Sequence, residues 1–347
     1  MSHPIHIIGA GLIGLSTADS LMERGRKVVV WDKAPAPGMG ANYINGAVLH
    51  PSQAAPWIVG GWNDDLEAPE RERLTREGLE LSARSTERLS RRMRELGLPE
   101  DRRGVVQVFG SETGRDLRLE AYARMGVRAS AARWMGHPAV DIHEDTTSDA
   151  NAYALRLAED LAERGAEFRM GLPIHLTRET GGAFRIHSGE RGAGEETGAE
   201  ELVVAAGHAT TGLLRPLGLE LDIEALPGHG LRFRRAADLP PVTVLDAESR
   251  TALTVLDDEV RLSGGVGLDT PDDLLPIWRE IAGEIVEVLG QPIRRWTGHR
   301  PASRSGPRMG ATPIEGLYVN AGHGHMGWTL SAGAGEIVAD TVQGARQ

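Results

Sequence analysis

The chain has 347 residues, of which 40% are hydrophobic and 25% charged, a composition typical of a folded globular protein. Its formal net charge of -11 disfavours broad binding to nucleic acid, because an extended positive field is missing. The absence of cysteine excludes disulfides, thiolate metal sites and a cysteinyl bond to a cofactor.

No stretch reaches the ~18 apolar residues that a membrane-spanning helix needs. The first residues run into a strand without a basic stretch and a long apolar segment, so we expect a cytoplasmic protein. A peripheral membrane contact and a homo-oligomer stay open.

A strand–helix–strand unit opens the chain. Residues 5–8 form an apolar run of strand character, a helical pattern extends to Gly25, and residues 28–31 form a second apolar run. Between the first strand and the helix lies the glycine-rich segment Gly9, Ala10, Gly11, Leu12, Ile13 and Gly14.

This spacing of glycines predicts a dinucleotide site. Gly9, Gly11 and Gly14 permit a tight turn, close approach of a pyrophosphate and close packing of the helix on the sheet. The helix N-terminus offers free N–H groups to the phosphates. Asp32, followed by Lys33, ends the second strand, where an acid accepts hydrogen bonds from a ribose. The alternative is three glycines in an ordinary turn.

The middle of the chain alternates between helical and strand patterns. A charged segment at 67–96 predicts surface helices, and the segment at 150–164 predicts an amphipathic helix. A strand is predicted at 105–109, further strands of the first sheet are predicted at 167–170 and 202–206, and an exposed hairpin loop is predicted at 189–198. The period then changes to short alternating strands, which indicate an antiparallel sheet, at 231–234, 242–245, 251–256 and 260–263. A helix with a strong apolar stripe at 273–289 would cover this sheet.

A second glycine-rich turn lies near the C-terminus, directly before an Ala/Gly-rich helix at 330–342. Such a turn supplies N–H donors and positive potential, which suit the negative charge of a reduced flavin around N1 and the C2 carbonyl. The alternative is a simple docking helix with a flexible lead-in. The candidate cofactor-binding residues of this turn are Gly322, His323, Gly324, Gly327, Trp328 and Thr329.

Several segments together resemble the FAD-dependent D-amino acid oxidase and dehydrogenase (DAO) family, above all its D-amino acid dehydrogenase branch, with glycine and sarcosine oxidases as relatives. They occur in the family's order and span the chain. Besides the first glycine turn with Asp32, they are residues 41–46 (ANYING), 51–57 (PSQAAPW), 203–207 (VVAAG), 296–301 (WTGHRP), 322–324 (GHG) and 327–329 (GWT).

The resemblance implies an α/β fold, α+β overall, with a discontinuous Rossmann-like FAD-binding domain and an interleaved antiparallel-sheet substrate domain. We assign residues 1–65, 140–215 and 295–347 to the FAD-binding domain and residues 66–139 and 216–294 to the substrate domain. FAD would be bound non-covalently. The resemblance adds Asn45, Gly46, Ala206 and Gly207 to the cofactor-binding residues.

The resemblance also implies that Arg300 binds a substrate carboxylate, which a planar guanidinium does through two parallel hydrogen bonds. His50 and His229 are further catalytic candidates, although each could be a structural histidine. His323 and His325 lie in a glycine-rich turn without a nearby acid, so we expect no metal site.

Three departures from the family bear on substrate specificity. The chain is shorter between the flavin motif and the substrate sheet than the family's dehydrogenases. His229 stands where that branch has an aromatic residue at the entry to this sheet. Gly40 stands where the branch more often has a hydroxyl residue near the flavin-binding turn.

The implied activity is FAD-dependent oxidative deamination of a small amino acid, with a D-amino acid favoured. The α-hydrogen would leave as hydride to flavin N5, giving an imino acid that water hydrolyses, and positioning would supply most of the catalysis. The electron acceptor would be a quinone, an electron-transfer protein or oxygen. The alternatives are an oxygen-dependent oxidase of glycine, sarcosine or a cyclic imino acid such as hydroxy-D-proline, and a non-catalytic flavin-binding subunit.

Overall fold

The computed structural model describes residues 3–43, 45–53, 67–99, 104–189 and 194–345. Ile44 and residues 54–57 of the matching segments, and the predicted domain boundary at residue 65, lie outside these ranges.

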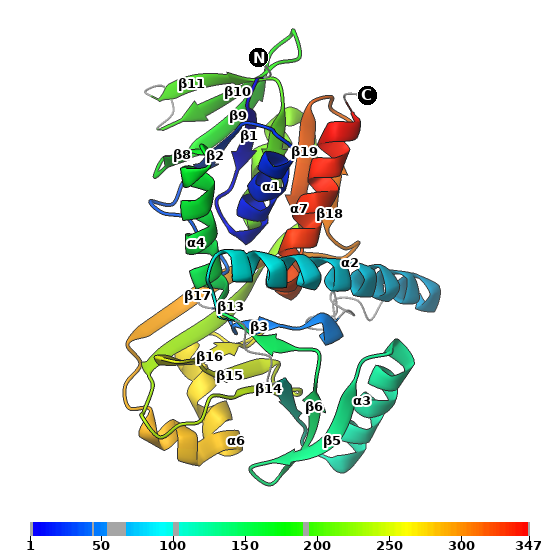
Figure 1. Cartoon of the computed structure of the whole chain (residues 1–347), viewed down its shortest axis with the longest axis vertical. Coiled ribbons are helices and arrows are strands. Elements are labelled where there is room, and N and C mark those ends of the chain that lie inside the picture. The colour runs from blue at the N-terminus through cyan, green and yellow to red at the C-terminus, as the bar shows by residue number, and fades with distance from the viewer. Residues whose placement is uncertain (1–2, 44, 54–66, 100–103, 190–193, 346–347) are drawn as a thin grey trace.

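A six-stranded sheet forms the upper part of the molecule in Figure 1, with the strand order β18-β19-β12-β1-β2-β8. All neighbouring strands are parallel except β18 and β19. The central strands are short apolar runs because both faces of a parallel sheet are covered. The strands are β1 (Ile5–Ile8), β2 (Val28–Asp32), β8 (Glu167–Met170), β12 (Leu202–Val204), β18 (Arg308–Ala311) and β19 (Leu317–Ala321).

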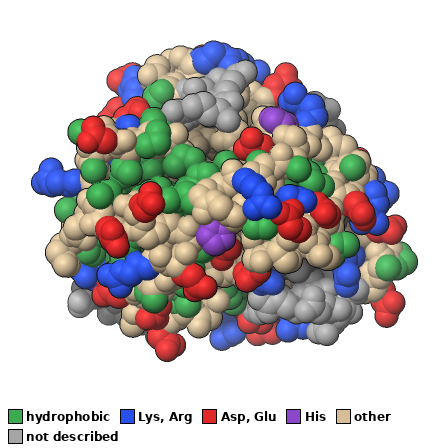
Figure 2. All heavy atoms as spheres, turned by 90° about the horizontal axis from the view of Figure 1, so that it is seen from below, with side chains coloured by type: hydrophobic (Ala, Val, Ile, Leu, Met, Phe, Trp, Pro, Cys, Tyr) green, Lys and Arg blue, Asp and Glu red, His purple; other side chains and the backbone are tan. Residues whose placement is uncertain are grey.

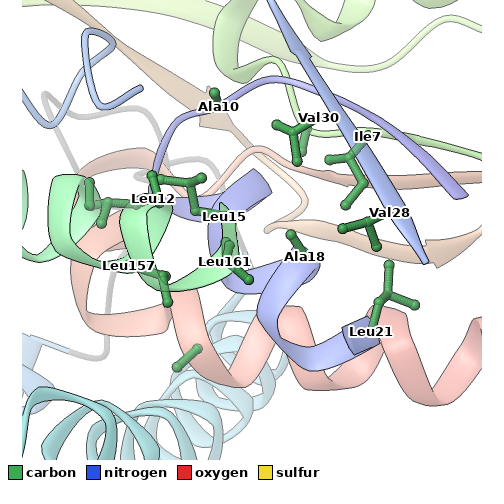
Figure 3. Close-up of a cluster of buried hydrophobic side chains, with 14 of the residues drawn as sticks. Ile7, Ala10, Leu12, Leu15, Ala18, Leu21, Val28, Val30, Leu157 and Leu161 are labelled. Carbon is green, nitrogen blue, oxygen red and sulfur yellow. The ribbon is translucent and has the colours of Figure 1, made fainter. Parts of the chain in front are cut away.

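Three helices cover one face of this sheet: α1 (Leu12–Glu23), α4 (Ala150–Glu163) and α7 (Gly327–Gly344). In Figure 3 the strand residues Ile7, Val28 and Val30 lie close to side chains of α1 and α4. The other face is covered by a three-stranded antiparallel sheet and α5 (Thr210–Leu214). The strands of this small sheet are β9 (Ile174–Arg178), β10 (Phe184–Ser188) and β11 (Glu195–Ala199).

An eight-stranded sheet forms the lower part, with the order β17-β13-β16-β15-β14-β4-β6-β5. Its neighbours are antiparallel except β14 and β4. Helix α6 (Leu274–Val288) buries its apolar stripe against this sheet, and α3 (Glu112–Met125) packs on β5 and β6. The strands are β4 (Val105–Val108), β5 (Ala129–Trp134), β6 (His137–Ile142), β13 (Ile223–Arg234), β14 (Thr243–Asp246), β15 (Thr251–Val255), β16 (Glu259–Gly264) and β17 (Arg294–Ser303).

These sheets confirm the predicted fold class, a Rossmann-like α/β region with an interleaved antiparallel sheet. The two sheets are connected through a short pair of strands, β3 (Val48–Leu49) and β7 (Thr146–Thr147). The division into domains stays a prediction. Within it, β17 joins the eight-stranded sheet, although it lies in the segment assigned to cofactor binding. The strand predicted at 105–109 is β4, which belongs to the eight-stranded sheet.

The expectation of surface helices at 67–96 is wrong in one respect. This segment is a single helix, α2 (Ala68–Glu95), which crosses beneath α4, α1 and α7 in Figure 1. Its Arg88 and Arg92 are buried, and both contact the carboxylate of Asp19 on α1, at 3.0 and 3.1 Å. Arg164 contacts the same carboxylate at 2.7 Å. Ion pairs of these arginines therefore help to attach α2 to α1.

Figure 2 shows the lower face, where hydrophobic side chains gather on the side on which α6 lies. Outside the buried stripe, Leu275, Ile277, Ile281 and Ile285 of α6 are half-buried, and Pro276 and Val288 are exposed. Among the described residues, no helix is long and apolar enough to cross a membrane.

Replacing Asp19 tests the ion network of α2. In Asp19→Ala the buried guanidinium groups of Arg88 and Arg92 lose their shared partner. The free energy of unfolding should fall by about 1–3 kcal/mol, because buried charge-assisted hydrogen bonds are lost while Arg88 keeps Glu23 and Arg92 keeps Asp160. Urea denaturation followed by circular dichroism measures this. Glu159→Gln, at the exposed ion pair with Arg156, is the matched control and should leave stability unchanged.

Candidate active site

The first glycine turn connects β1 to α1, and its shape depends on missing side chains. Gly9 has φ +118°, and a Cβ there would lie 2.3 Å from the carbonyl oxygen of Ala205. A Cβ on Gly14 would lie 1.8 Å from the Gly9 oxygen. A Cβ on Gly11 would meet only Asn42, at 3.9 Å. The backbone is therefore packed tightly behind the turn and open in front of Gly11, where a phosphate can approach.

Asp32 fixes this turn from the end of β2. Its Oδ2 accepts a hydrogen bond from the Ala10 N–H at 2.7 Å, and its Oδ1 accepts one from the Ala34 N–H at 2.8 Å. Each carboxylate oxygen can accept a further hydrogen bond. Asp32 therefore shapes the loop and could still bind a ribose hydroxyl pair.

A cavity of about 1200 Å³ runs from Asp32 to the eight-stranded sheet. It exceeds the ~300–1,000 Å³ of ordinary small-ligand pockets, so it has room for a dinucleotide together with a small substrate. The predicted residues that line it are Gly9, Gly11, Leu12, Ile13, Asp32, Lys33, Asn45, Gly46, His50, Ala206, Gly207, His229, Arg300, His323, Gly324, Gly327 and Trp328.

Four predicted residues do not line the cavity. The N–H of Ala10 donates a hydrogen bond to Asp32, and Gly14 packs against the backbone of Gly9 behind the turn. Thr329 accepts a hydrogen bond at Oγ1 from the His50 N–H, at 3.1 Å. Gly322 has φ +88° and starts the second glycine turn. These residues support the lining from behind.

The second glycine turn places buried imidazoles at the cavity. His323 is fully buried, and neither of its ring nitrogens has a hydrogen-bond partner among the described residues. Burial lowers the pKa of His323 to about 3, so its ring is neutral at pH 7. Buried polar atoms are normally hydrogen-bonded, so these nitrogens indicate a site for a polar ligand.

His50 lies beside His325, with the two rings edge to face and their centres 5.6 Å apart. Burial lowers the pKa of His50 to about 4. The pKa of His325 is lowered well below its usual value by burial and by the nearby charges of Arg300 and Arg250. Both rings are therefore neutral at pH 7, and neither adds a positive charge to the cavity.

Arg300 reaches the cavity across the β13–β17 ladder. It lies on β17 opposite Leu226, and its guanidinium lies over Gly228, where a Cβ would be 2.2 Å from Nη1. Nη1 donates to the Pro227 carbonyl at 3.0 Å. Within the described part of the chain, no carboxylate lies within 4 Å of this guanidinium. Its remaining donors are available to an anionic ligand.

His229 has a different environment. Its Nδ1 lies 3.0 Å from Thr297 Oγ1 and its Nε2 lies 2.9 Å from the Leu268 carbonyl oxygen. Consecutive residues of a strand face opposite sides of the sheet. The Arg300 guanidinium lies over Gly228, so the ring of the next residue, His229, points to the other face of β13. With both nitrogens bonded and 4% exposure, the geometry favours a structural role for His229.

A polar cluster beside the cavity has no signal in the sequence. Ser52 donates to the fully buried carboxyl of Asp145 from its N–H, at 3.0 Å, and from its hydroxyl, at 2.6 Å. Gln53 donates to the Tyr122 hydroxyl at 2.7 Å, which donates to Gln107 at 3.0 Å. Only the folded sheet brings these distant residues together.

The comparisons with known proteins agree with this geometry. Residues 5–341 match the family model described as FAD dependent oxidoreductase (DAO). The chain is 31% identical over 400 residues to a D-amino acid dehydrogenase of Xylella fastidiosa (strain M23), covering 97% of this chain and 91% of that protein. This alignment is longer than the chain, so the relative carries inserted segments.

Solved structures show the same fold. Iminodiacetate oxidase from Chelativorans sp. BNC1 superposes with a TM-score of 0.79 at 21% identity, covering 98% of this chain and 95% of that one. Glycine oxidase from Bacillus cereus ATCC 14579 gives a TM-score of 0.79 at 20% identity, covering 100% and 96%. The chain belongs to the FAD-dependent oxidoreductase family and is a flavin-dependent enzyme.

The cavity fits FAD. Gly11 and the first turn of α1, which has no side-chain cap, leave backbone N–H groups free for the pyrophosphate. Asp32 could bind a ribose hydroxyl pair. His323, whose ring nitrogens have no hydrogen-bond partner among the described residues, lines the same cavity as Arg300. These residues could hold the two ends of the cofactor.

Replacing Asp32 tests the cofactor end. Asp32→Ala removes a carboxylate that accepts hydrogen bonds from the Ala10 and Ala34 N–H groups. The same carboxylate would accept hydrogen bonds from the ribose. FAD affinity should fall at least about tenfold, because a charge-assisted hydrogen bond is lost. Fluorescence titration of apoprotein with FAD measures this. Asp257→Ala, in the exposed turn before β16, should bind FAD like the wild type.

The pH dependence of stability tests the buried cluster. Burial raises the pKa of Asp145 from 3.8 to about 7, so between these values the folded state holds a proton that the unfolded state releases. The contribution of Asp145 to the free energy of unfolding therefore falls as the pH rises through this window.

In Asp145→Asn this titration is absent, and an amide can still bond Ser52. Stability relative to the wild type should therefore rise from about pH 4 to about pH 8. Urea denaturation across this range measures the difference. The exposed Asp141→Asn is the control, with the same pH profile as the wild type. A constant offset for Asp145→Asn would contradict the account.

Proposed function

We propose that this enzyme oxidises a small α-amino acid at its α-carbon, as a dehydrogenase of D-amino acids. The observation that carries the proposal is the guanidinium of Arg300, which lies in the cavity that fits FAD and has no carboxylate partner among the residues that the structure describes. Support for the amino acid class also comes from the relative named D-amino acid dehydrogenase.

Arg300 binds the substrate carboxylate in this proposal. A guanidinium can donate two parallel hydrogen bonds to a carboxylate, which fixes both the position and the plane of the substrate. Gly228 is required because any side chain there would displace the guanidinium. The remaining part of the amino acid then extends toward the imidazoles of His50 and His323.

The neutral imidazoles suit this substrate. A protonated histidine beside the amino group would repel an ammonium and would compete with Arg300 for the carboxylate. Burial keeps His50 and His323 uncharged, so they can orient the amino group by hydrogen bonds without altering the charge balance. Orientation of this kind supplies much of the rate acceleration in reactions between bound groups.

Bound FAD supplies a two-electron acceptor for the α-hydrogen. The amine loses its α-hydrogen with the bonding electrons and a proton from nitrogen, and the resulting imino acid is hydrolysed by water to a keto acid and ammonia. A dehydrogenase and an oxidase share these steps and differ in what reoxidises the cofactor. We propose a quinone or an electron-transfer protein rather than oxygen. A cytoplasmic location and a homo-oligomer stay predictions.

Replacing Arg300 tests the proposal. Arg300→Met retains length and removes the charge, so the second-order rate constant of anaerobic FAD reduction by D-amino acids should fall by about 10²–10³-fold. Gly228→Ala should cause a comparable loss, since it displaces the same group. Stopped-flow absorbance measures both rates.

Arg295→Met is the matched control. Arg295 lies on the same strand, exposed and paired with Asp272 at 2.9 Å, and its variant should react like the wild type. Equal rates for Arg300→Met and the control would show that the carboxylate is bound elsewhere. A panel of D-amino acids, glycine and sarcosine that leaves the flavin oxidised would overturn the proposed activity.

A further inference from the structure

A second arginine lines the substrate end of the cavity. Arg250 lies in the turn between β14 and β15 and is exposed. Among the described residues it has no hydrogen-bond or ion-pair partner. An arginine at a protein surface is commonly solvated, so exposure alone does not indicate a role.

The backbone of Arg250 sets it apart from an ordinary surface arginine. Its φ is +56°, in the left-handed region, and in the described part of the chain only Ala47 and Met135 share this feature among non-glycine residues. A non-glycine residue in this region is strained, and such residues cluster at functional sites. Glycine or asparagine would hold this turn at lower cost.

The register of the sheet places Arg250 close to Arg300. His229 on β13 is opposite Gly264 on β16, and Gly264 is opposite Thr251 on β15. Arg250 precedes Thr251, and Gly228, which carries the Arg300 guanidinium, precedes His229. The backbones of Gly228 and Arg250 are therefore about two strand spacings apart, about 10 Å. Both side chains line the same cavity.

The electrostatic surroundings agree with this placement. The charges of Arg300 and Arg250 both lower the pKa of His325, so both guanidinium groups lie near one imidazole. Arg118 of α3 also lines this end of the cavity, with its guanidinium 5.6 Å from the Tyr122 ring centre.

Among the described residues that line this end, the one acid is Asp246, and its Oδ2 accepts hydrogen bonds from the N–H and hydroxyl of Ser249. The other carboxylate of the lining is Asp32, at the dinucleotide end. Three arginines, Arg118, Arg250 and Arg300, therefore face one acid, Asp246, in this part of the lining. A single substrate carboxylate would not neutralise the remaining positive charge.

We propose that Arg250 determines specificity by binding a second carboxylate of the substrate, so that the preferred substrate is a short amino acid with an acidic side chain. This inference rests on the proposed function, in which Arg300 binds the α-carboxylate. One guanidinium then holds each end of the substrate, and the α-carbon lies between them. Two fixed ends restrict rotation of the substrate more than one end does.

Binding can be tested without turnover. Succinate has two carboxylates and no amino group, so it cannot be oxidised as an amine, and succinamate replaces one carboxylate by an amide of the same shape. Calorimetric titration of the FAD-loaded protein should show at least about tenfold tighter binding of succinate than of succinamate. Asparagine tolerates the left-handed backbone, so Arg250→Asn should keep the turn and reduce the ratio of the succinate and succinamate affinities to near one. Arg295→Asn, at an exposed arginine, should keep it.

Turnover gives an independent readout. Anaerobic FAD reduction should be faster with D-aspartate than with D-asparagine, and with D-glutamate than with D-glutamine, at limiting substrate. Arg250→Asn should make the rates of each acid and its amide equal, whereas Arg295→Asn should keep the preference for the acids.

The two proposals fail in different ways. If D-alanine reduces the flavin and no acid is preferred over its amide in the wild type, the inference on Arg250 is wrong and the proposed function stands. If the succinate preference depends on Arg250 but no amino acid reduces the flavin, the second carboxylate site is supported and the proposed function fails. An equal succinate preference in the wild type and Arg250→Asn overturns the role of Arg250.

Discussion

The close contact between the first and the last helix is the constraint on which the site depends. A Cβ on Gly335 of α7 would lie 2.5 Å from the carbonyl oxygen of Ser16 on α1, and a Cβ on Gly333 would lie 2.8 Å from Leu81 of α2. The small residues of α7 therefore let it lie between these helices at backbone distance. This contact fixes the turn before α7, and with it His323, at the cavity that the first glycine turn also lines.

The eight-stranded sheet supplies the chemistry of the opposite wall. Arg300 of β17 extends across to β13, where Gly228 has no side chain and leaves room for the guanidinium. No acid pairs with this guanidinium in the described part of the chain. Burial keeps the neighbouring imidazoles of His50 and His323 neutral. The result is a cavity in which guanidinium groups carry the positive charge and the histidines contribute hydrogen-bonding capacity alone.

Sequence patterns predicted the parts of this arrangement that depend on local order. The glycine turn, β8 and α4 followed from short-range periodicity, and the β14–β16 strands from their alternation. The interior of β13 was missed because Pro227 and Gly228 interrupt its pattern, and β17 because polar residues alternate with glycine and proline. The small sheet of β9, β10 and β11 includes part of a segment predicted to be a loop. The Asp145 cluster and the proximity of Arg250 to Arg300 depend on strand register, which a single sequence does not contain.

The central claim is that both ends of the chain and one guanidinium surround a single FAD. A crystal structure of the FAD-loaded protein with a bound, non-oxidisable carboxylate tests it most directly. The account predicts the pyrophosphate at Gly11, the isoalloxazine ring beside His323, and the carboxylate on Arg300 through two hydrogen bonds. A flavin ring remote from the turn before α7, or a carboxylate bound away from Arg300, would contradict it.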